Sequence, residues 1–281
     1  MIQRMPAEAI PKSMDPGVVA QIQMRLGGLS RSHEVTLPLA VESGSRAWGF
    51  PSPDSDYDCR FLFIRRAEDY LSPWRKRDVI ETPLDAVFDV NGWDLAKALQ
   101  LLLKGNAVVL EWLTSPIRYR QDARFVDDFL ELARTVADRR RIARHYLHLG
   151  ETQRRKFFSD GRATSRKKLF YVLRPAAALR WLRMHPSEAV PPMNFLELMQ
   201  GCAPPRDVLE ATQRLAAEKA ASREMGIAPL ELILARFVDD EFEQARDLRD
   251  FAENQMGAWA RGHAEDFFIA QLRRSEVAAF D

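Results

Sequence analysis

The chain has 281 residues, with 41 lysine and arginine residues against 40 aspartate and glutamate residues, and a formal net charge of +1. This length allows one large domain or two smaller ones, each with its own core. No apolar run approaches the roughly 20 residues of a membrane-spanning helix, and Met1–Pro11 lack the apolar stretch of a secretory signal. With only two cysteines, Cys59 and Cys202, we expect no disulfide framework and a cytoplasmic location.

Charge is unevenly distributed along the chain. Between Arg139 and Arg183, fourteen basic residues stand against two acidic ones. Between Glu231 and Asp266 the balance is reversed, with ten acids against four arginines. The basic region predicts a partner that carries phosphate groups, such as RNA. The alternative is a helix face that the acidic segment neutralises.

Hydrophobic spacing divides the chain into a part with strands and a part without them. Asp15-Pro16 predicts the start of a helix, and Gly27-Gly28 predict its end. Alternation predicts extended segments at residues 35–41, 56–64, 79–82 and 87–90. Helical spacing predicts helices at residues 95–105, 125–136, 139–158, 165–185, 194–200, 208–225 and 230–256. We expect Pro175 to kink its helix. The pattern predicts an α+β protein, with an α/β unit at residues 1–120 and a helical unit at residues 121–281.

Two aspartates carry the clearest functional pattern. Alternation places Asp56 and Asp58 on one side of a strand, with Cα atoms roughly 6.5–7 Å apart, so both carboxylates can point at one spot. At ~4 Å two such charges repel by about 4 kcal/mol near a protein surface, and a divalent cation between them removes this cost. Oxygen ligands without histidine or cysteine nearby favour Mg²⁺. The alternative is a solvent-exposed strand face without a role.

The surrounding residues resemble a known superfamily. Gly44-Ser45, ten intervening residues and Asp56-Tyr57-Asp58 resemble the Gly-Ser and Asp-x-Asp signature of the DNA polymerase beta-like nucleotidyltransferases. The wider sequence is similar to a bacterial branch predicted to act in RNA repair. The similar runs are Glu42–Phe50, Ser55–Asp58, Asn91–Leu95, Lys104–Asn106, Glu111–Leu113 and Leu173–Pro175. Ala107 departs from the branch, which usually has proline there, and leaves the catalytic motifs intact.

The resemblance implies a small catalytic domain with a mixed sheet at residues 1–120, followed by an all-helical domain at residues 121–281 that binds substrate or nucleotide. It also implies that Gly44 and Ser45 hold the nucleotide phosphates through backbone amides and the serine hydroxyl. Asp56 and Asp58 would bind two Mg²⁺ ions.

A third carboxylate on an adjacent strand usually completes such a metal site and can accept the proton of the acceptor hydroxyl. We expect Asp89 in this role. Asp94 is the alternative, but an acid at the start of the helix from Leu95 is accounted for by the helix dipole. For Arg46 two roles stay open: it steadies the triphosphate, or it braces a loop carboxylate.

Lys168 and Tyr171 are the expected nucleotide contacts in the helical part. Lys167, Tyr171 and Arg174 fall at i, i+4 and i+7 of one predicted helix and would share a face, with Lys168 beside it. An aromatic ring on a basic face favours contact with a triphosphate or with acceptor phosphates. In related nucleotidyltransferases a helix of this kind closes over the nucleotide. A solvated basic helix is the alternative.

The sequence thus predicts Mg²⁺-dependent transfer of a nucleoside monophosphate from an NTP, in the first place ATP, to a hydroxyl, with release of pyrophosphate. We expect the acceptor to be an RNA end that the basic region at residues 139–183 contacts, and no membrane partner. Adenylylation of a protein, a toxin activity on tRNA and a non-catalytic nucleic-acid-binding module stay open. The absence of GxxxxGKS argues against a P-loop enzyme.

Overall fold

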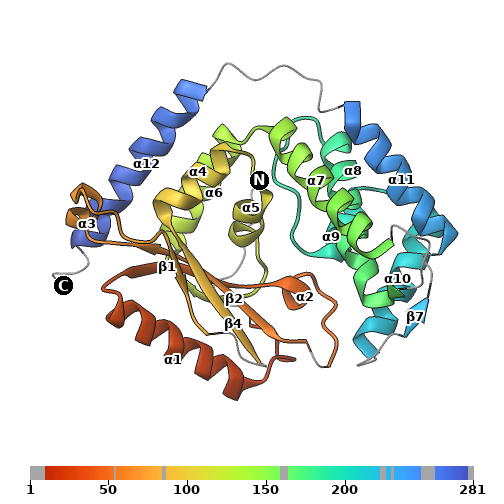
Figure 1. The fold of residues 1–281 in the computed structure, drawn as a ribbon, viewed down its shortest axis with the longest axis horizontal. Helices are drawn as coiled ribbons and strands as arrows, with labels where there is room; N and C mark the ends of the chain where they lie inside the picture. The colour runs from red at the N-terminus through yellow and green to blue at the C-terminus, as the bar shows by residue number, and fades with distance from the viewer. Residues whose placement is uncertain are drawn as a thin grey trace.

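The protein is described by a computed structural model, which covers residues 10–53, 55–83, 87–158, 164–221, 226–228, 231–247 and 257–277 (Figure 1). The elements of the first part are α1 (Pro16–Ser32), β1 (Thr36–Ser43), α2 (Gly44–Ala47), β2 (Tyr57–Ile64), α3 (Ala67–Leu71), β3 (Val79–Glu81), β4 (Phe88–Asp94), α4 (Leu95–Leu103), α5 (Ala107–Leu113), β5 (Arg118–Gln121) and α6 (Ala123–Val136). The later elements are α7 (Arg139–Phe158), β6 (Thr164–Ser165), a 3-10 helix (Arg166–Leu169), α8 (Phe170–Met184), α9 (Phe195–Gly201), α10 (Arg206–Ala221), β7 (Ile227–Ala228), α11 (Leu232–Arg246) and α12 (Gly257–Val277).

Five strands form a mixed sheet in the order β3-β4-β2-β1-β5. β2 and β4 run parallel, whereas β1 pairs antiparallel with β2 and β5, and β3 pairs antiparallel with β4. α1 covers one face of the sheet, and α4, α5 and α6 lie on the other (Figure 1). A helical region follows the sheet in the chain, so the predicted α+β fold is confirmed.

Strand β2 alternates as the sequence predicts. Cys59, Phe61 and Phe63 are buried with the residues of α1, whereas Leu62 and Ile64 are buried with the helices of the opposite face. Gly92 on β4 lies opposite Phe61 on β2, and a Cβ atom at Gly92 would overlap the phenyl ring of Phe61. The small residue thus allows β4 to pair closely with a strand that carries large aromatic side chains.

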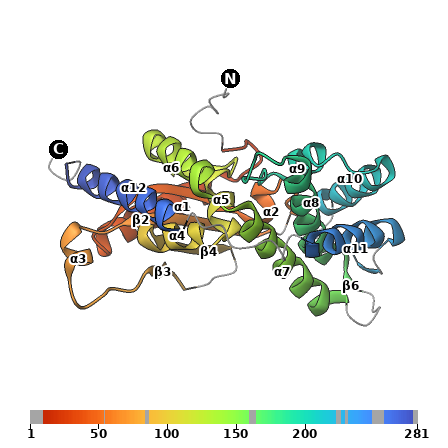
Figure 2. The ribbon, with the colours of Figure 1, turned by 90° about the horizontal axis from the view of Figure 1, so that it is seen from above.

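The last described helix, α12, returns to the sheet part of the molecule (Figures 1 and 2). Phe267 contacts the rings of Phe125 and Phe129 on α6, and Phe268 meets Tyr70 of α3 edge to face. One hydrophobic cluster therefore includes residues from the sheet, the helical region and α12. The division into two domains at residue 120 stays a prediction.

Several element boundaries differ from the sequence prediction. α1 continues through Gly27-Gly28 to Ser32, because its buried face packs on the sheet and this burial offsets the roughly 1 kcal/mol helix cost of each glycine. Residues 166–169 form a 3-10 helix, so the predicted helix at 165–185 begins as α-helix only at Phe170. Strand β4 extends to Asp94, four residues beyond its predicted end.

Several further elements lie outside the predictions, helix α5 and the two-residue strands β6 and β7 among them. Strand β5, helix α3 and helix α12 were not predicted, because four- and five-residue segments and a helix of weak amphipathicity carry little periodicity. The predicted helix at 230–256 corresponds to α11 at Leu232–Arg246, and residues 248–256 lie outside the described part. The predicted helix at 208–225 corresponds to α10, and residues 222–225 also lie outside it.

Candidate active site

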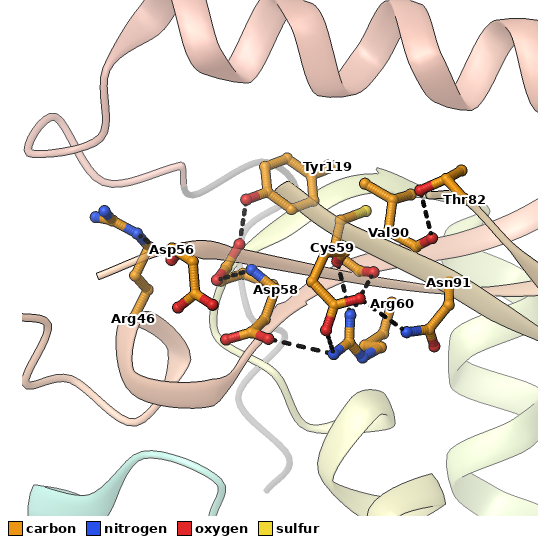
Figure 3. Close-up of polar contacts among 11 residues, drawn as sticks. Arg46, Asp56, Asp58, Cys59, Arg60, Thr82, Val90, Asn91 and Tyr119 are labelled. Atoms are coloured by element: carbon orange, nitrogen blue, oxygen red, sulfur yellow. Dashed lines mark hydrogen bonds and ion pairs between the residues drawn. The ribbon is translucent and has the colours of Figure 1, made fainter. Parts of the chain in front are cut away.

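Three carboxylates gather where β2 begins. Asp56 immediately precedes β2, Asp58 is its second residue, and Asp89 on β4 lies in register with Asp58. The side chains of Asp56 and Asp58 point to the same side of the strand (Figure 3). Asp56 is exposed, and the side chain of Asp58 is 21% exposed. The two neighbouring acids of the motif therefore face the same side, as the alternation predicts.

The glycine-serine turn packs directly against one of these acids. Gly44 follows β1 with a φ of +64°, and a Cβ atom at this position would overlap the carboxylate of Asp58. Ser43, the residue before it, pairs with Asp58 across the β1–β2 ladder. Ser45 lies in the short helix α2, and its Oγ donates to Oγ of Ser55 at 3.0 Å. The bend and the carboxylates thus border the same spot.

Arg60 lies between two of the carboxylates. Its Nη2 is 2.6 Å from Oδ2 of Asp89 and 3.2 Å from Oδ1 of Asp58, and its Nη1 donates to the carbonyl of Asp89 at 2.7 Å (Figure 3). Asn91 donates to the other oxygen of Asp89 at 3.1 Å. The sequence places Arg60 on the same side of the strand as Asp58, yet alternation by itself does not predict this pairing.

A buried glutamate contacts the backbone of one of the site's aspartates. Glu42 on β1 is fully buried, accepts a hydrogen bond from the hydroxyl of Tyr119, and accepts another from the backbone N–H of Asp58 at 2.9 Å. Burial raises the pKa of Glu42 to about 7. Neither Glu42 nor Tyr119 was predicted as a site residue. The only signal for Glu42 is a charged residue directly before Ser43-Gly44 in an otherwise apolar strand.

The electrostatics of Asp58 suit a cation. Burial, and next the charge of Asp56, raise the pKa of Asp58 to about 6. Gly44 leaves room beside its carboxylate, and the donors are oxygens, which Mg²⁺ prefers. The residues therefore fit a divalent cation held by Asp56 and Asp58. Among the described residues, no group of three histidine, cysteine or acidic side chains is arranged as a complete metal site; Asp89, the expected third ligand, is paired with Arg60.

Asp94 is engaged elsewhere. It caps α4 by accepting from the N–H of Ala96 at 2.8 Å, accepts from the hydroxyl of Tyr70 at 3.1 Å, and lies 3.7 Å from Nε of Arg65. Along β4 it pairs with Phe63, five positions beyond the Asp58–Asp89 pair. Its helix-capping position agrees with the sequence interpretation. Asp94 therefore lies apart from the group formed by Asp56, Asp58 and Asp89.

Arg46 holds the backbone of the loop. Its Nε donates to the carbonyl of Asp56 at 3.0 Å, its Nη2 donates to the carbonyl of Ser55 at 2.5 Å, and its guanidinium stacks on the ring of Tyr57 at 3.8 Å. The guanidinium points away from Asp58 (Figure 3). Of the two roles left open, bracing is the one with visible contacts, although the partners are carbonyl groups and not a carboxylate.

Aromatic and basic side chains of the helical region lie beside the glycine-serine turn. Tyr171 meets Trp48, which follows this turn, edge to face. Burial, and next the charges of Asp58 and Asp56, raise the pKa of Tyr171. Nζ of Lys168 lies over the rings of Phe157 and Tyr171, 5.0 and 5.3 Å from their centres. Phe157, at the end of α7, was not predicted; no spacing in the sequence connects it to Tyr171.

The predicted shared face of Lys167, Tyr171 and Arg174 forms only in part. Tyr171 and Arg174 both contact Trp48, although Arg174 is buried and Tyr171 is 39% exposed. Lys167 lies in the 3-10 helix at residues 166–169, where the α-helical spacing behind the prediction does not apply. Lys168, predicted to lie beside the face, is the residue that lies over Tyr171.

Arg174 instead joins the helical region to the sheet part. Its Nη1 donates to Glu111 of α5 at 2.7 Å, and its guanidinium lies 4.8 Å from the ring centre of Trp48. Trp48 follows the glycine-serine turn and meets Tyr171 edge to face. The motifs around residues 48, 111 and 174 are thus one buried contact next to the site.

Much of the basic region is paired within the chain. Arg180 and Arg183 on α8 share Glu241 of α11 at 2.8 and 2.6 Å. Arg154 on α7 pairs with Asp239, which also lies on α11. Acids of α11 therefore neutralise several of the arginines that the sequence assigned to a phosphate partner.

The comparisons with known proteins agree with this geometry. The model of the RNA repair pathway DNA polymerase beta family, RlaP, matches residues 18–269. The chain belongs to this family. An uncharacterized protein of Bacillus subtilis (strain 168), YcgL, is 35% identical over 216 residues, which are 77% of this chain and 82% of the relative. The resemblance inferred from the sequence is therefore confirmed, and with it a polymerase beta-like family associated with RNA repair. Within the part of the chain that the structure describes, none of the helices has both the length and the hydropathy of a membrane span.

Proposed function

We propose that this chain is a Mg²⁺-dependent nucleotidyltransferase that transfers a nucleoside monophosphate from an NTP, in the first place ATP, to the hydroxyl of an RNA end. The observation that carries the proposal is the close packing of Gly44 on the Asp58 carboxylate, with Asp56 beside it. Such a bend, edged by two acids, suits a triphosphate with its cation. Family membership supports the same chemistry.

In this proposal Asp56 and Asp58 hold the cation, and Asp89 is their third partner. When bound, Mg²⁺ would neutralise part of the charge of the triphosphate and would make the acceptor hydroxyl more acidic. The acceptor oxygen forms a bond to the α-phosphorus, the bond from that phosphorus to the bridging oxygen breaks, and pyrophosphate leaves. Asp89 takes the hydroxyl proton. Because Arg60 contacts both Asp58 and Asp89, it offsets their charge before the nucleotide binds.

The remaining residues orient the nucleotide. Backbone N–H groups at Gly44 and Ser45, with the Ser45 hydroxyl, bind the phosphates. Lys168 and Tyr171 contact the nucleotide from the 3-10 helix and from α8, because Tyr171 packs on Trp48 beside the glycine-serine turn and Lys168 lies over its ring. Arg46 keeps Asp56 in place through the Asp56 carbonyl, and a direct contact with the triphosphate stays a prediction.

The test combines binding and transfer. The four NTPs with Mg²⁺ are screened by thermal shift, and α-labelled ATP is then incubated with bulk RNA. We expect at least one NTP to stabilise the protein and label to appear on RNA, and Asp56→Asn to abolish transfer. Stabilisation without label transfer to any acceptor supports a binding module, and label on protein supports adenylylation; either result contradicts the proposal.

A matched pair of variants tests the third carboxylate. We expect Asp89→Asn to lose transfer, because this carboxylate lies beside Asp58. Asp94→Asn should lower stability and keep turnover, because its partners are Tyr70 and Arg65. Near-full turnover of Asp89→Asn together with loss in Asp94→Asn would reverse the assignment.

A further inference from the structure

The chain between α3 and β3 loops out from the body of the molecule (Figure 2). We call residues 71–77 the Trp74 tip. Leu71 and Trp74 in this tip are each 84% exposed, the highest exposure of any large apolar side chain in the described residues. Burial of such a side chain contributes roughly 2–3 kcal/mol to stability, so two exposed side chains in one short loop indicate a contact surface.

The tip is held in place at both ends. Arg65, which is buried, donates to the carbonyl of Arg77 at 2.9 Å and lies 3.7 Å from Asp94. At the other end, Tyr70 packs edge to face on Phe268 of α12. Within the tip, the N–H of Trp74 donates to Oγ of Ser72 at 3.1 Å. The indole ring is therefore presented to solvent by an ordered turn.

Basic residues follow the exposed ring. Arg75, Lys76 and Arg77 come directly after Trp74, and Lys76 and Arg77 make ion pairs with Asp69 and Glu81 at 2.6 and 2.5 Å. The Arg77–Glu81 pair is exposed on both sides and contributes only about 0–1 kcal/mol, so a phosphate can replace Glu81 at little cost. An exposed aromatic ring with adjacent cations matches the chemistry of single-stranded nucleic acid, in which a base stacks and phosphates pair.

We propose that the Trp74 tip binds a single-stranded stretch of the RNA acceptor, with a base stacked on Trp74 and a phosphate bound by Arg75. This inference rests on the RNA acceptor of the proposed function. The tip lies at the end of the sheet opposite α2 (Figures 1 and 2). Asp58 and Ile64 are six residues apart on β2, which corresponds to roughly 20 Å. Only an RNA long enough to cover this distance contacts the tip and the carboxylates together.

Fluorescence anisotropy with labelled single-stranded RNA tests the tip through binding, without nucleotide transfer. Two RNAs, of about two and about 25 nucleotides, are titrated with wild type, Trp74→Ala and Trp259→Ala, because the shorter one cannot reach from the carboxylates to the tip. Trp259 is the matched control, because it is also exposed, at 45%, and lies on α12. We expect Trp74→Ala to weaken binding of the long RNA about tenfold and to leave the short RNA unchanged, whereas Trp259→Ala changes neither.

Two more variants sharpen the result. Trp74→Phe should keep part of the affinity, because a phenyl ring also stacks. Arg75→Ala should reduce the slope of log affinity against log salt by about one, as expected for one lost phosphate contact. Equal thermal stability of all variants shows that the fold is unchanged.

Each contrary result has a distinct meaning. Equal affinity of Trp74→Ala and Trp259→Ala for the long RNA overturns the inference and leaves the proposed function standing. If Trp74→Ala weakens binding of the short RNA as much as binding of the long RNA, the contact does not lie at a distance from the carboxylates, and the inference is wrong. Failure of wild type to bind either RNA overturns the RNA acceptor itself and the inference with it. If Trp74→Ala binds anionic phospholipid vesicles more weakly than wild type while its RNA affinity is unchanged, the tip is a membrane contact and the inference is wrong.

Discussion

At the scale of single residues, Asp58 combines a functional position with an unfavourable environment. Burial and the charge of Asp56 raise its pKa from 3.8 to about 6, so the folded protein holds a proton that the unfolded chain releases. Stability therefore falls as the pH rises from about 4 to about 6, and the full cost is present above that range. Such a cost is typical of a group retained for function rather than for stability.

Replacement of this carboxylate should stabilise the protein. We expect Asp58→Asn to raise the free energy of unfolding at pH 8 by about 3 kcal/mol, since a shift of about two pKa units corresponds to that value. The gain should shrink as the pH falls toward 4. Urea unfolding at a series of pH values measures it, with Asp128→Asn, whose side chain is 42% exposed, as control. A loss of stability at pH 8 would contradict the explanation.

Gly44 is a second residue whose role can be tested by itself. Its φ of +64° and the overlap of any Cβ atom with Asp58 predict that Gly44→Ala lowers stability by about 1–3 kcal/mol and abolishes the thermal shift caused by an NTP. Gly28→Ala is the control, because Gly28 lies inside α1 with open space around it. That change should stabilise by roughly 0.5–1 kcal/mol. Similar effects of both substitutions on nucleotide binding would refute the role of Gly44.

At the scale of elements, a buried ion pair joins α5 to α8 beside the site. Glu111 accepts from Arg174 at 2.7 Å and from the hydroxyl of Tyr146 on α7 at 3.0 Å. Because Arg174 also lies over Trp48, and Trp48 contacts Tyr171, this pair sets the position of α8 relative to the glycine-serine turn.

A second group of ion pairs, between α8 and α11, serves as the control for the Glu111 pair. Glu241 accepts from Arg180 and Arg183 away from the carboxylates. Glu111→Gln should lower stability by about 3–5 kcal/mol, because it leaves the buried Arg174 without its carboxylate. Glu241→Gln should lower stability by less, because the side chains of Arg180 and Arg183 are 19% and 36% exposed. Only Glu111→Gln should also weaken NTP binding, by about tenfold, as measured by calorimetry at a temperature where both variants are folded. Equal dissociation constants would show that the Glu111 pair is purely structural.

The elements also show where sequence patterns stop being informative. Alternation predicts β2 correctly because its two faces pack against different helices. The same reasoning misses β5, since four residues hold two alternations at most. It also ends α1 too early, because burial of the helix face outweighs the preference of glycine for a helix end.

At the scale of the whole molecule, the chain is not a sheet part simply followed by helices. α12 returns to α6, where Phe267 packs on Phe125 and Phe129 and Arg274 pairs with Asp122. The acidic segment seen in the sequence also has a place in three dimensions, since α11 pairs with arginines of α7 and α8. Much of the apparent basic surface is thus internal charge compensation.

The sequence by itself determined the family, the α+β class and the shared side of Asp56 and Asp58, because a two-residue spacing on a strand and a short glycine turn are local properties. Only the tertiary structure decided that Arg60 lies between Asp58 and Asp89, that Phe157 approaches Tyr171, and that Arg174 is buried on Trp48. These contacts join segments distant in the chain, and their geometry depends on how sheet and helices pack.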